Sequence, residues 1–469
     1  MYTKHTYQDW LATPETERPE LARQIVQRYV SSDDFKTALL ADRYFRGDNP
    51  TIEKKRVLRA VAVDAPGGKG KKRTAMREII GNQIRNNFFF RFVVQEAQYL
   101  LGNGVTVDTP ETKAALGLGF DTVMEQIGEA ALRHGVAYGY WNNDHLEPLL
   151  ACVDAASGFV ALPDERTGAL MVGVQFWRLT RGKPMYYRVF EPDGVTMYRK
   201  ADDGEIEIEE AKRAYKLRVT RDAIGVTGIE GENYGALPII PLYGNPMKIS
   251  ELTPSIRSKI DLYDNIVSDF GDNLDRANDV YWVLNNFGGT MSDVAEMMQQ
   301  IHELRAVVNL SDGMGGGSTA TAQTVEVPYE ARKTAMELLH KALYADYMAL
   351  DMDAMTGGSL TNVAIQAAMT NLNLKADRFE WQAFAFVQGV LALIGKASEK
   401  IAFKRQQITN RSETVQDIYA MREDIDRETA LKLNPYIDEE QIPDIMDAMD
   451  AQEITGLSGM RALDRLTEA

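Results

Sequence analysis

The sequence predicts a multidomain α+β protein, and three patterns support that class. Thirteen of the sixteen prolines lie in the first 254 residues, and none occurs between Pro328 and Pro435. Because proline suits turns and disrupts helix interiors, the N-terminal half should be mixed α/β and the C-terminal half mainly helical. Alternating apolar runs between residues 148 and 209 predict an antiparallel sheet with one solvated face. A single helical pattern then runs from Thr361 to Gln406.

The first 50 residues predict short helices, and a basic, glycine-rich loop at residues 65–74 follows the apolar run Val57–Val63. Its spacing nearly matches a phosphate-binding loop, and a helix from Thr74 to Leu101 is predicted after it. Lys72 stands where such a loop has the Ser or Thr that holds Mg²⁺. We expect a solvated loop, and a nucleotide-binding enzyme that uses Gly67–Lys71 is the less favoured alternative.

A helix over Asp121–Arg133 and a series of short strands follow. The histidines His134 and His145 stand alone, without the spacing of a metal site, so we expect no metal, no cofactor and no acid–base role. The predicted strands are Pro148–Val153, Leu170–Arg178, Met185–Phe190, Val195–Arg199 and Glu205–Glu209.

Thr253 and Pro254 predict the start of a regular helix, because Thr caps helices and proline is favoured at the first helical position. Its narrow apolar seam fits either a helical hairpin within one chain or a contact between subunits. The seam consists of Ile256, Ile260, Tyr263, Val267, Phe270, Leu274 and Ala277.

A small α/β segment is expected next, with strands at Tyr281–Leu284, Ala306–Leu310 and Thr324–Val327 and a helix over Ser292–Glu303. A second regular helix, Tyr329–Leu350, then leads back from it. The small segment is therefore carried on the ends of two helices.

The long helix from Thr361 to Gln406 would span roughly 65 Å. We expect it to be buried on more than one side, because a second apolar stripe (Leu374, Trp381, Phe384 and Leu391) widens the first. The first stripe consists of Ile365, Met369, Leu372, Ala376, Phe379, Ala383, Phe386, Val390, Ile394, Ala397 and Ile401.

The composition describes a chain that can bury a large core, with 45% hydrophobic and 26% charged residues. Cys152 is the only cysteine, which excludes an internal disulfide and fits a reducing compartment. No signal peptide and no membrane-spanning segment are expected. The net charge of −16 argues against a static grip on nucleic acid, because phosphate neutralisation requires a basic excess.

The chain resembles the portal proteins of tailed double-stranded DNA bacteriophages, the siphophage-type portal family, from about residue 80 onward. No single motif is diagnostic, so the resemblance depends on the order and spacing of the matching segments. The long helix opens with Thr361-Asn362, where the family more often has Ser-Gly. The matching segments are Asn86–Val105, Gly235–Ile240, Ile260–Ile266, Leu360–Ile365 and Glu423–Thr429.

The resemblance implies the portal fold: a mixed α/β wing, a two-helix stem, a small α/β clip, a long spine helix and a helical C-terminal crown. The implied regions are wing 1–251, stem helix 252–283, clip 284–328, stem helix 329–350, tunnel loop 351–361, spine helix 362–406 and crown 407–469.

The resemblance also implies candidate site residues and no catalytic centre. The tunnel loop would touch passing DNA through Asp351, Met352, Asp353, Met355, Gly357 and Gly358. Basic residues of the second stem helix, Arg332, Lys333 and Lys341, would guide phosphates. The clip would dock partners through Asp293, Glu296, Gln300 and Glu303.

By the same resemblance, the partners would be further copies in a dodecameric ring and double-stranded DNA passing without sequence preference. The terminase large subunit, head-completion or adaptor proteins, and capsid and scaffolding proteins would bind the ring, with no membrane involved. The ring would assemble in the host cytoplasm and occupy one capsid vertex in the virion. A non-portal structural or adaptor protein is the other alternative.

Overall fold

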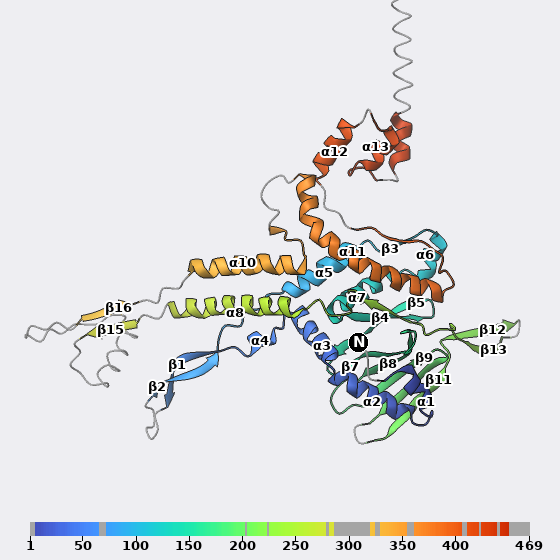
Figure 1. Cartoon of the computed structure of the whole chain (residues 1–469), viewed down its shortest axis with the longest axis horizontal. Coiled ribbons are helices and arrows are strands. Elements are labelled where there is room, and N and C mark those ends of the chain that lie inside the picture. Colours follow the sequence, from blue (N-terminus) through green and yellow to red (C-terminus); the bar gives the residue numbers. More distant parts are fainter. Residues whose placement is uncertain are drawn as a thin grey trace, which may run out of the picture. The chain divides into compact units, whose positions relative to one another are not determined.

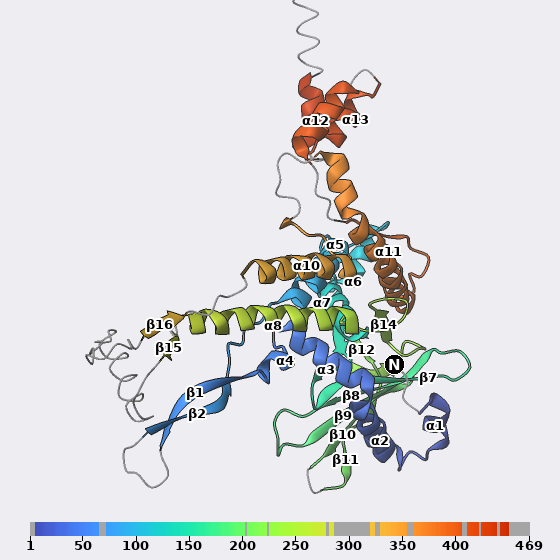
Figure 2. The same cartoon turned by 60° about the vertical axis from the view of Figure 1, so that its left-hand side comes forward.

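The computed structural model describes residues 5–64, 72–201, 204–222, 225–277, 281–285, 319–323, 329–353, 361–405, 410–421, 424–438 and 441–449. It divides into two compact units, each built from separate stretches of the chain. Unit 1 holds residues 1–42, 89–252 and 344–469, and unit 2 holds 43–88 and 253–343. Figures 1 and 2 show the elements of both.

A six-stranded antiparallel sheet forms the centre of unit 1, in the order β11-β10-β9-β8-β7-β6. One face is covered by α1 (Tyr7–Ala12), α2 (Arg18–Ser31) and the start of α3 (Asp33–Phe45), whose Trp10, Tyr29 and Phe35 join a core with Phe176 and Val189. The strands are β6 (Cys152–Asp154), β7 (Ser157–Pro163), β8 (Leu170–Trp177), β9 (Met185–Glu191), β10 (Gly194–Lys200) and β11 (Ile206–Arg213).

The other face of this sheet packs on a second sheet of three strands, β14 (Ile239–Tyr243), β4 (Val136–Asn142) and β5 (His145–Leu150). Tyr138 and Tyr140 of β4 meet Phe159 and Phe190 in this second core. The two cores use alternate residues of the same strands, as a sheet buried on both faces requires.

Helices cover the outer face of the smaller sheet. The helix α7 (Phe120–His134) ends at Gly135, whose φ of 86° gives the left-handed cap that glycine favours. The long helix α11 (Asn362–Leu393) lies beside it (Figure 1). Gly139 of β4 makes room for α11, since a Cβ there would lie 2.5 Å from the Phe386 ring.

The remaining elements of unit 1 include α5 (Phe88–Leu101), α6 (Pro110–Leu116), and the hairpin β12 (Lys216–Asp222) with β13 (Gly225–Glu232). A short ladder joins distant parts of the chain, because β3 (Val105–Val107) pairs with β17 (Ile401–Phe403). The C-terminal helices are α12 (Arg411–Ala420) and α13 (Arg427–Leu433), followed by helical residues at 442–449.

Unit 2 holds two antiparallel hairpins and two long helices. The hairpins are β1 (Arg56–Asp64) with β2 (Lys72–Ile80), and β15 (Tyr281–Asn285) with β16 (Thr319–Gln323). The helices α8 (Pro254–Ala277) and α10 (Tyr329–Tyr347) lie side by side in Figures 1 and 2. They are antiparallel, because Phe270 near the end of α8 contacts Tyr329 at the start of α10, with ring centroids 6.0 Å apart. The short α4 (Pro50–Glu53) contacts α8.

Two helices predicted from the sequence have other bounds in the structure. Residues 72–80 form β2, not the start of a helix, because β1 offers them a complete strand partner; α5 begins only at Phe88. The long helix ends at Leu393, not Gln406: Gly395 has a φ of 74°, and Lys396 N–H donates to Leu391 O in a Schellman stop. At 32 residues it spans about 48 Å.

The strands β7, β12 and β13 were not predicted, whereas β8, β9, β10 and β11 lie where the sequence places them. Within the described residues, no helix combines the length and apolar character needed to cross a bilayer.

Candidate functional site

Unit 1 contains a buried charged cluster around Lys375 of α11. Lys375 of α11 places its Nζ 3.0 Å from Glu96 of α5 and 2.9 Å from Glu251, which lies three residues before α8. The same ammonium donates to the backbone oxygen of Tyr347 at 3.0 Å and lies 3.1 Å from the centre of its ring. One side chain of α11 thus contacts Glu96, Glu251 and Tyr347 within unit 1.

The cluster carries one cation for two carboxylates, and it is closed to water at Glu96, which is 1% exposed. Burial raises the pKa of Glu96 to about 7, against the opposing pull of Lys375. The Tyr347 hydroxyl donates to Glu96 at 2.9 Å, and burial also raises the pKa of that tyrosine. If Glu96 carried a proton, the positive charge of Lys375 and the negative charge of Glu251 would balance.

A second polar arrangement, in unit 2, lies along α8. Three of its polar residues are buried at four-residue intervals: Asp264, Ser268 and Asp272. They accept the backbone N–H groups of Asn86, Ile84 and Asn82 at 3.0, 3.0 and 2.9 Å, respectively. We call these three acceptors the polar ladder.

The polar ladder forms because the spacing of the acceptors along α8 matches the spacing of alternate amides along the extended segment. Four residues of α-helix rise about 6 Å, and two residues of extended chain advance about 6.6 Å. Each second amide of the segment 82–86 therefore meets the next acceptor on α8. Gly81 permits the close approach, since a Cβ there would lie 2.8 Å from an Asp272 oxygen.

Each end of the polar ladder has further partners. Asp264 also accepts from the side chains of Asn86 and Asn49, both at 2.9 Å, while burial raises its pKa. Lys55 lies 3.7 Å from Asp272 and 2.8 Å from Asp269. The buried charges are thus met by donors, as charged groups removed from water require.

The polar ladder corrects the predicted seam of α8. Ile256 and Ile260 are buried as expected, but Leu274 is 50% exposed. The face of α8 that carries the polar ladder was expected to face water, but it binds the extended segment 82–86.

The head of α11 carries a second set of polar contacts in unit 1. The Thr361 hydroxyl accepts from Ala364 N–H at 3.3 Å, which confirms the predicted cap. Asn362 donates its backbone N–H to Glu413 of α12 and accepts from Asn410 N–H at 2.7 Å. An open groove of about 680 Å³ lies here, lined by residues that include Tyr99, Gln366, Met369, Asn373, Ile418 and Met421.

Three large apolar side chains of α11 are exposed to solvent along one line of the helix. Val363, Leu374 and Trp381 are 74%, 52% and 73% exposed, and their spacing of eleven and seven residues puts them in one line. The sequence predicted burial for Leu374 and Trp381, so this part of the second stripe is wrong for the single chain. Such a row of large apolar side chains indicates a surface that another protein covers.

One known protein family matches most of this chain. The model of the family described as "Phage portal protein, SPP1 Gp6-like" matches residues 29–455. The chain belongs to this family of phage portal proteins.

Individual relatives are distant in sequence. The portal protein of Bacillus phage SPP1 is 24% identical over 459 residues, covering 91% of this chain and 86% of the relative. The portal protein of Clostridium phage phiCD119 is 27% identical over 147 residues, 31% of this chain, and the match spans 32% of that protein's length.

Two solved structures are similar over 74% of this chain at 12% identity and a TM-score of 0.43. One comes from the neck of an empty gene transfer agent particle, where 90% of the matched chain is covered. The other comes from a native gene transfer agent virion, where 89% of the matched chain is covered.

The basic residues predicted for the portal channel differ in their surroundings. Arg332 is partly buried and donates to the backbone oxygen of Asp269 on α8 at 3.4 Å, so it joins the two helices. Lys333 and Lys341 are exposed on α10. Lys333 and Lys341 are thus more exposed than Arg332, and the role of all three in guiding phosphates stays a prediction.

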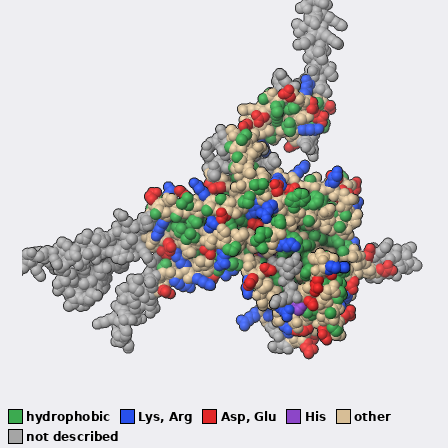
Figure 3. Space-filling model, in the orientation of Figure 1, with side chains coloured by type: hydrophobic (Ala, Val, Ile, Leu, Met, Phe, Trp, Pro, Cys, Tyr) green, Lys and Arg blue, Asp and Glu red, His purple; other side chains and the backbone are tan. Residues whose placement is uncertain are grey.

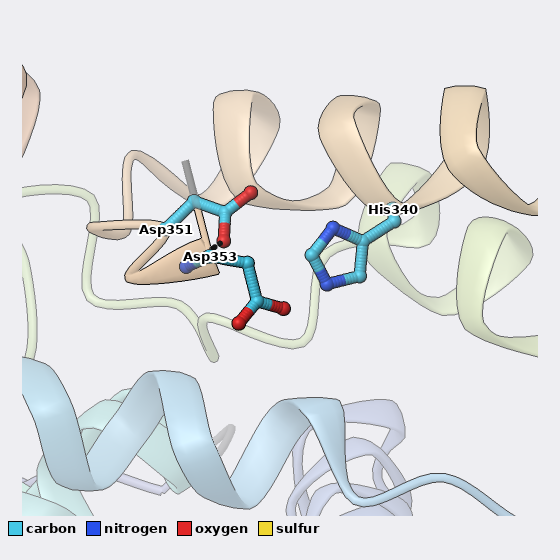
Figure 4. Close-up of side chains that lie close together, drawn as sticks. All are labelled: His340, Asp351 and Asp353. Carbon is cyan, nitrogen blue, oxygen red and sulfur yellow. Dashed lines mark hydrogen bonds between the residues drawn. The ribbon is translucent and has the colours of Figure 1, made fainter. Parts of the chain in front are cut away.

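The predicted tunnel loop is described only at its start. Asp351 and Asp353 follow α10, and Asp353 N–H donates to an Asp351 carboxylate oxygen at 3.1 Å (Figure 4). Met352 is 52% exposed. Met355, Gly357 and Gly358 lie outside the described residues, as do the clip positions Asp293, Glu296, Gln300 and Glu303.

Sequence reasoning missed the charged cluster and the polar ladder. A signal existed for the first, since Lys375 falls between Leu372 and Ala376 on the buried face of α11. For the second, the four-residue spacing of polar residues on α8 was visible, but nothing in the sequence showed which extended segment would bind them.

Proposed function

We propose that this portal family member assembles into a ring, with a dodecamer as the family-typical number, around a channel at one vertex of a phage capsid. Double-stranded DNA enters through the channel during packaging and leaves through it during ejection. The observation that carries the proposal is the family match over residues 29–455.

The open face of α11 supports assembly. Val363, Leu374 and Trp381 would be covered by a neighbouring copy, which removes an exposed apolar row that a monomer would retain. The net charge of −16 supports a sliding contact with DNA, because excess carboxylates repel phosphates and prevent tight binding.

We assign the channel contacts to the segment 351–361 and to Lys333 and Lys341, and the docking of the terminase motor and head-completion proteins to residues 284–328. The role is structural and needs no catalysis. The alternative phosphate loop loses its main support, because β2 and not a helix follows residues 65–71, and such loops bind phosphate with a helix N-terminus.

Imaging and native mass spectrometry of the purified chain test the ring. We expect closed rings, whereas a monodisperse species of 52.5 kDa at micromolar concentration would contradict the proposal and favour an adaptor protein.

Deleting Ala354–Gly358 tests the tunnel loop. We expect rings to form and DNA packaging or retention to fail. Deleted rings that package and hold full-length DNA as well as the parent would make this segment a connector only.

A further inference from the structure

The last residues before the proposed tunnel loop are fastened to the inside of unit 1. The Gln95 side chain makes two hydrogen bonds to one residue: its amide group donates to the Leu350 backbone oxygen at 3.0 Å, and its own oxygen accepts the Leu350 N–H at 2.9 Å. Leu350 is 5% exposed and belongs to one buried apolar cluster with Met369 and Leu372 of α11. Asp351, where the proposed tunnel loop begins, follows directly.

The chain turns sharply just before Leu350. Ala349 N–H donates to Tyr344 O at 3.0 Å, and Met348 has a φ of 63°. This left-handed conformation is usually taken by glycine at a helix C-terminus, so a methionine keeps it only where surrounding contacts compensate for the strain. The segment Tyr347–Leu350 is therefore held closed by its contacts, and it opens more easily when they weaken.

The contacts that hold this segment include the charged cluster around Lys375. The Lys375 ammonium donates to the Tyr347 backbone oxygen, and the Tyr347 hydroxyl donates to Glu96. Glu96 also lies 3.0 Å from the Lys375 ammonium. Glu96 therefore acts on the segment Tyr347–Leu350 in two ways, directly through the hydroxyl and indirectly through Lys375. Its neighbour on α5, Gln95, holds the other end of the same segment.

The cluster holds two carboxylates against one ammonium. Along α5, the neighbours of Glu96 one turn away, Phe92 and Leu100, are apolar and buried. Over the visible surface of the chain, charged side chains of both signs are spread in contact with water, which screens them (Figure 3). Inside the cluster a change of one proton alters a charge that water does not screen. The charged and titratable groups that act on Glu96 are Lys375 of α11, Tyr347 at the end of α10, and Glu251 before α8.

We propose that Glu96 is a positioning residue whose proton controls how firmly the segment Tyr347–Leu350, and with it the start of the tunnel loop, is held. The inference rests on the proposed function for the role of the loop. With a proton on Glu96, the charges of Lys375 and Glu251 balance and the segment is closed. Without that proton, two carboxylates compete for one ammonium, and Lys375 holds the Tyr347 oxygen less firmly.

The direction of the pH dependence follows from burial, which raises the pKa of Glu96 to about 7. When the segment opens, water reaches the carboxyl, and its pKa returns toward the ordinary value of 4.5. The closed segment therefore binds this proton more tightly than the open one. Closing is favoured at pH 5, weakens as the pH rises, and levels off above the pKa of the closed state. From pH 5 to pH 8 the open fraction should rise about 50- to 100-fold.

Hydrogen exchange with mass spectrometry on the full chain measures this opening. Protection of residues 347–353 is compared at pH 5, 6, 7 and 8, after correction for the intrinsic exchange rate of each amide. In the parent, protection should fall as the open fraction rises. Glu96→Gln keeps an acceptor for the Tyr347 hydroxyl and cannot ionise, so its protection should stay constant over this range. Glu111→Gln, on an exposed carboxylate of α6, is the matched control and should follow the parent.

Two further variants distinguish control by a proton from a contact that only supports the fold. Glu251→Gln removes the competing carboxylate, so the fall in protection should be smaller and end at a lower pH. Gln95→Ala should lower protection by the same factor at every pH, because it removes hydrogen bonds that do not titrate. Parent protection that ignores pH, or a Glu96→Gln variant that keeps the parent's pH dependence, overturns the proposal. If Glu96→Gln does not fold, the shift in Glu251→Gln decides.

A spin label measures the effect on the tunnel loop itself. In a Cys152→Ala background, Met352→Cys carries the label two residues beyond Leu350, at a side chain that is 52% exposed in the parent. Its mobility should rise from pH 5 to pH 8 and stay low when Glu96→Gln is added. A label that ignores pH refutes the proposal, as does equal protection of residues 347–353 and α7, which would mean that all of unit 1 unfolds. If the parent forms no rings, the proposed function fails, whereas these readouts still decide the role of Glu96.

Discussion

The helices α8 and α11 bury their inner faces by different means. From Ile365 to Leu391, α11 buries apolar residues at every turn, with Lys375 as its one buried charge. Beyond Ile260, α8 buries Asp264, Ser268 and Asp272. One helix is held by area removed from water, and the other by hydrogen bonds to a facing backbone.

The difference affects how each helix can move. Burial of apolar area is non-directional, so it tolerates small shifts of one surface on another. A hydrogen bond weakens steeply when its geometry is lost, and each amide of 82–86 has its own acceptor on α8. The polar ladder therefore fixes the register of α8 against the segment 82–86 within unit 2.

The strongest test of this contrast removes the one buried cation of α11. Lys375→Met should lower the free energy of unfolding by about 3 to 5 kcal/mol at pH 7.5, because the buried Glu96 and the partly buried Glu251 both lose their cation. Urea titration followed by circular dichroism measures the change. Lys396→Met, on an exposed lysine beyond α11, is the control, and an equal response of both variants would contradict the assignment.

Acidity should act on the same cluster with a defined sign. The pKa of Glu96 is about 7 in the folded chain and near 4.5 when unfolded, so the folded chain takes up this proton first as pH falls. Between pH 8 and pH 5 the carboxyl should add about 2 to 3 kcal/mol of stability. In Glu96→Gln that gain should disappear while the contacts of Tyr347 and Lys375 persist. Parallel stability profiles for both proteins would refute the interpretation.

Breaking one rung of the polar ladder should have a smaller, local effect. Asp264→Ala removes the acceptor of Asn86 N–H and should cost about 2 kcal/mol, with exchange of that amide rising about 30-fold. Ser268→Ala should act in the same way on Ile84, and Asp272→Ala on Asn82. Hydrogen exchange at residue resolution is the measurement. A uniform response at all three amides would show that the segment detaches as a whole.

The smallest effects should come from the ends of α11. Thr361→Ala and Gly395→Ala should each cost about 1 kcal/mol, the first by loss of a cap and the second by strain at a φ of 74°. Glu413→Gln is a matched change at the head of α11 that keeps an acceptor for Asn362 N–H. Thermal unfolding detects all three, and a loss above 3 kcal/mol for either end would show that the termini matter more than the buried face.

Hydrophobic periodicity predicted α11 better than α8 for a physical reason. The buried stripe from Ile365 to Val390 was predicted residue by residue, since an apolar core leaves a period in the sequence. For α8 the same rule pointed to Leu274, because polar residues are assumed to face water. An acceptor for a distant backbone amide looks the same in sequence as a solvated side chain.

The remaining failures also involve partners that the local sequence pattern does not show. From the sequence alone, residues 72–80 resemble the start of a helix, but in the structure they pair with β1 as a strand. Lys375 resembles an isolated lysine in the sequence, but in the structure it contacts Glu96 and Glu251. Six residues of the predicted site have described positions, and their roles stay predictions: Arg332, Lys333, Lys341, Asp351, Met352 and Asp353. The clip residues and the remaining tunnel-loop residues are untested.

The pairing of β3 with β17 has a consequence for synthesis. Val107 meets Ile401 and Val105 meets Phe403, so an early strand depends on one made almost three hundred residues later. At about 5 to 20 residues per second, β3 waits roughly 15 to 60 s on the ribosome for its partner. A chain that stops before residue 401 can never close this ladder. Chains that end before residue 401 therefore expose the unpaired edge of β3, although β3 itself lies within the first 107 residues.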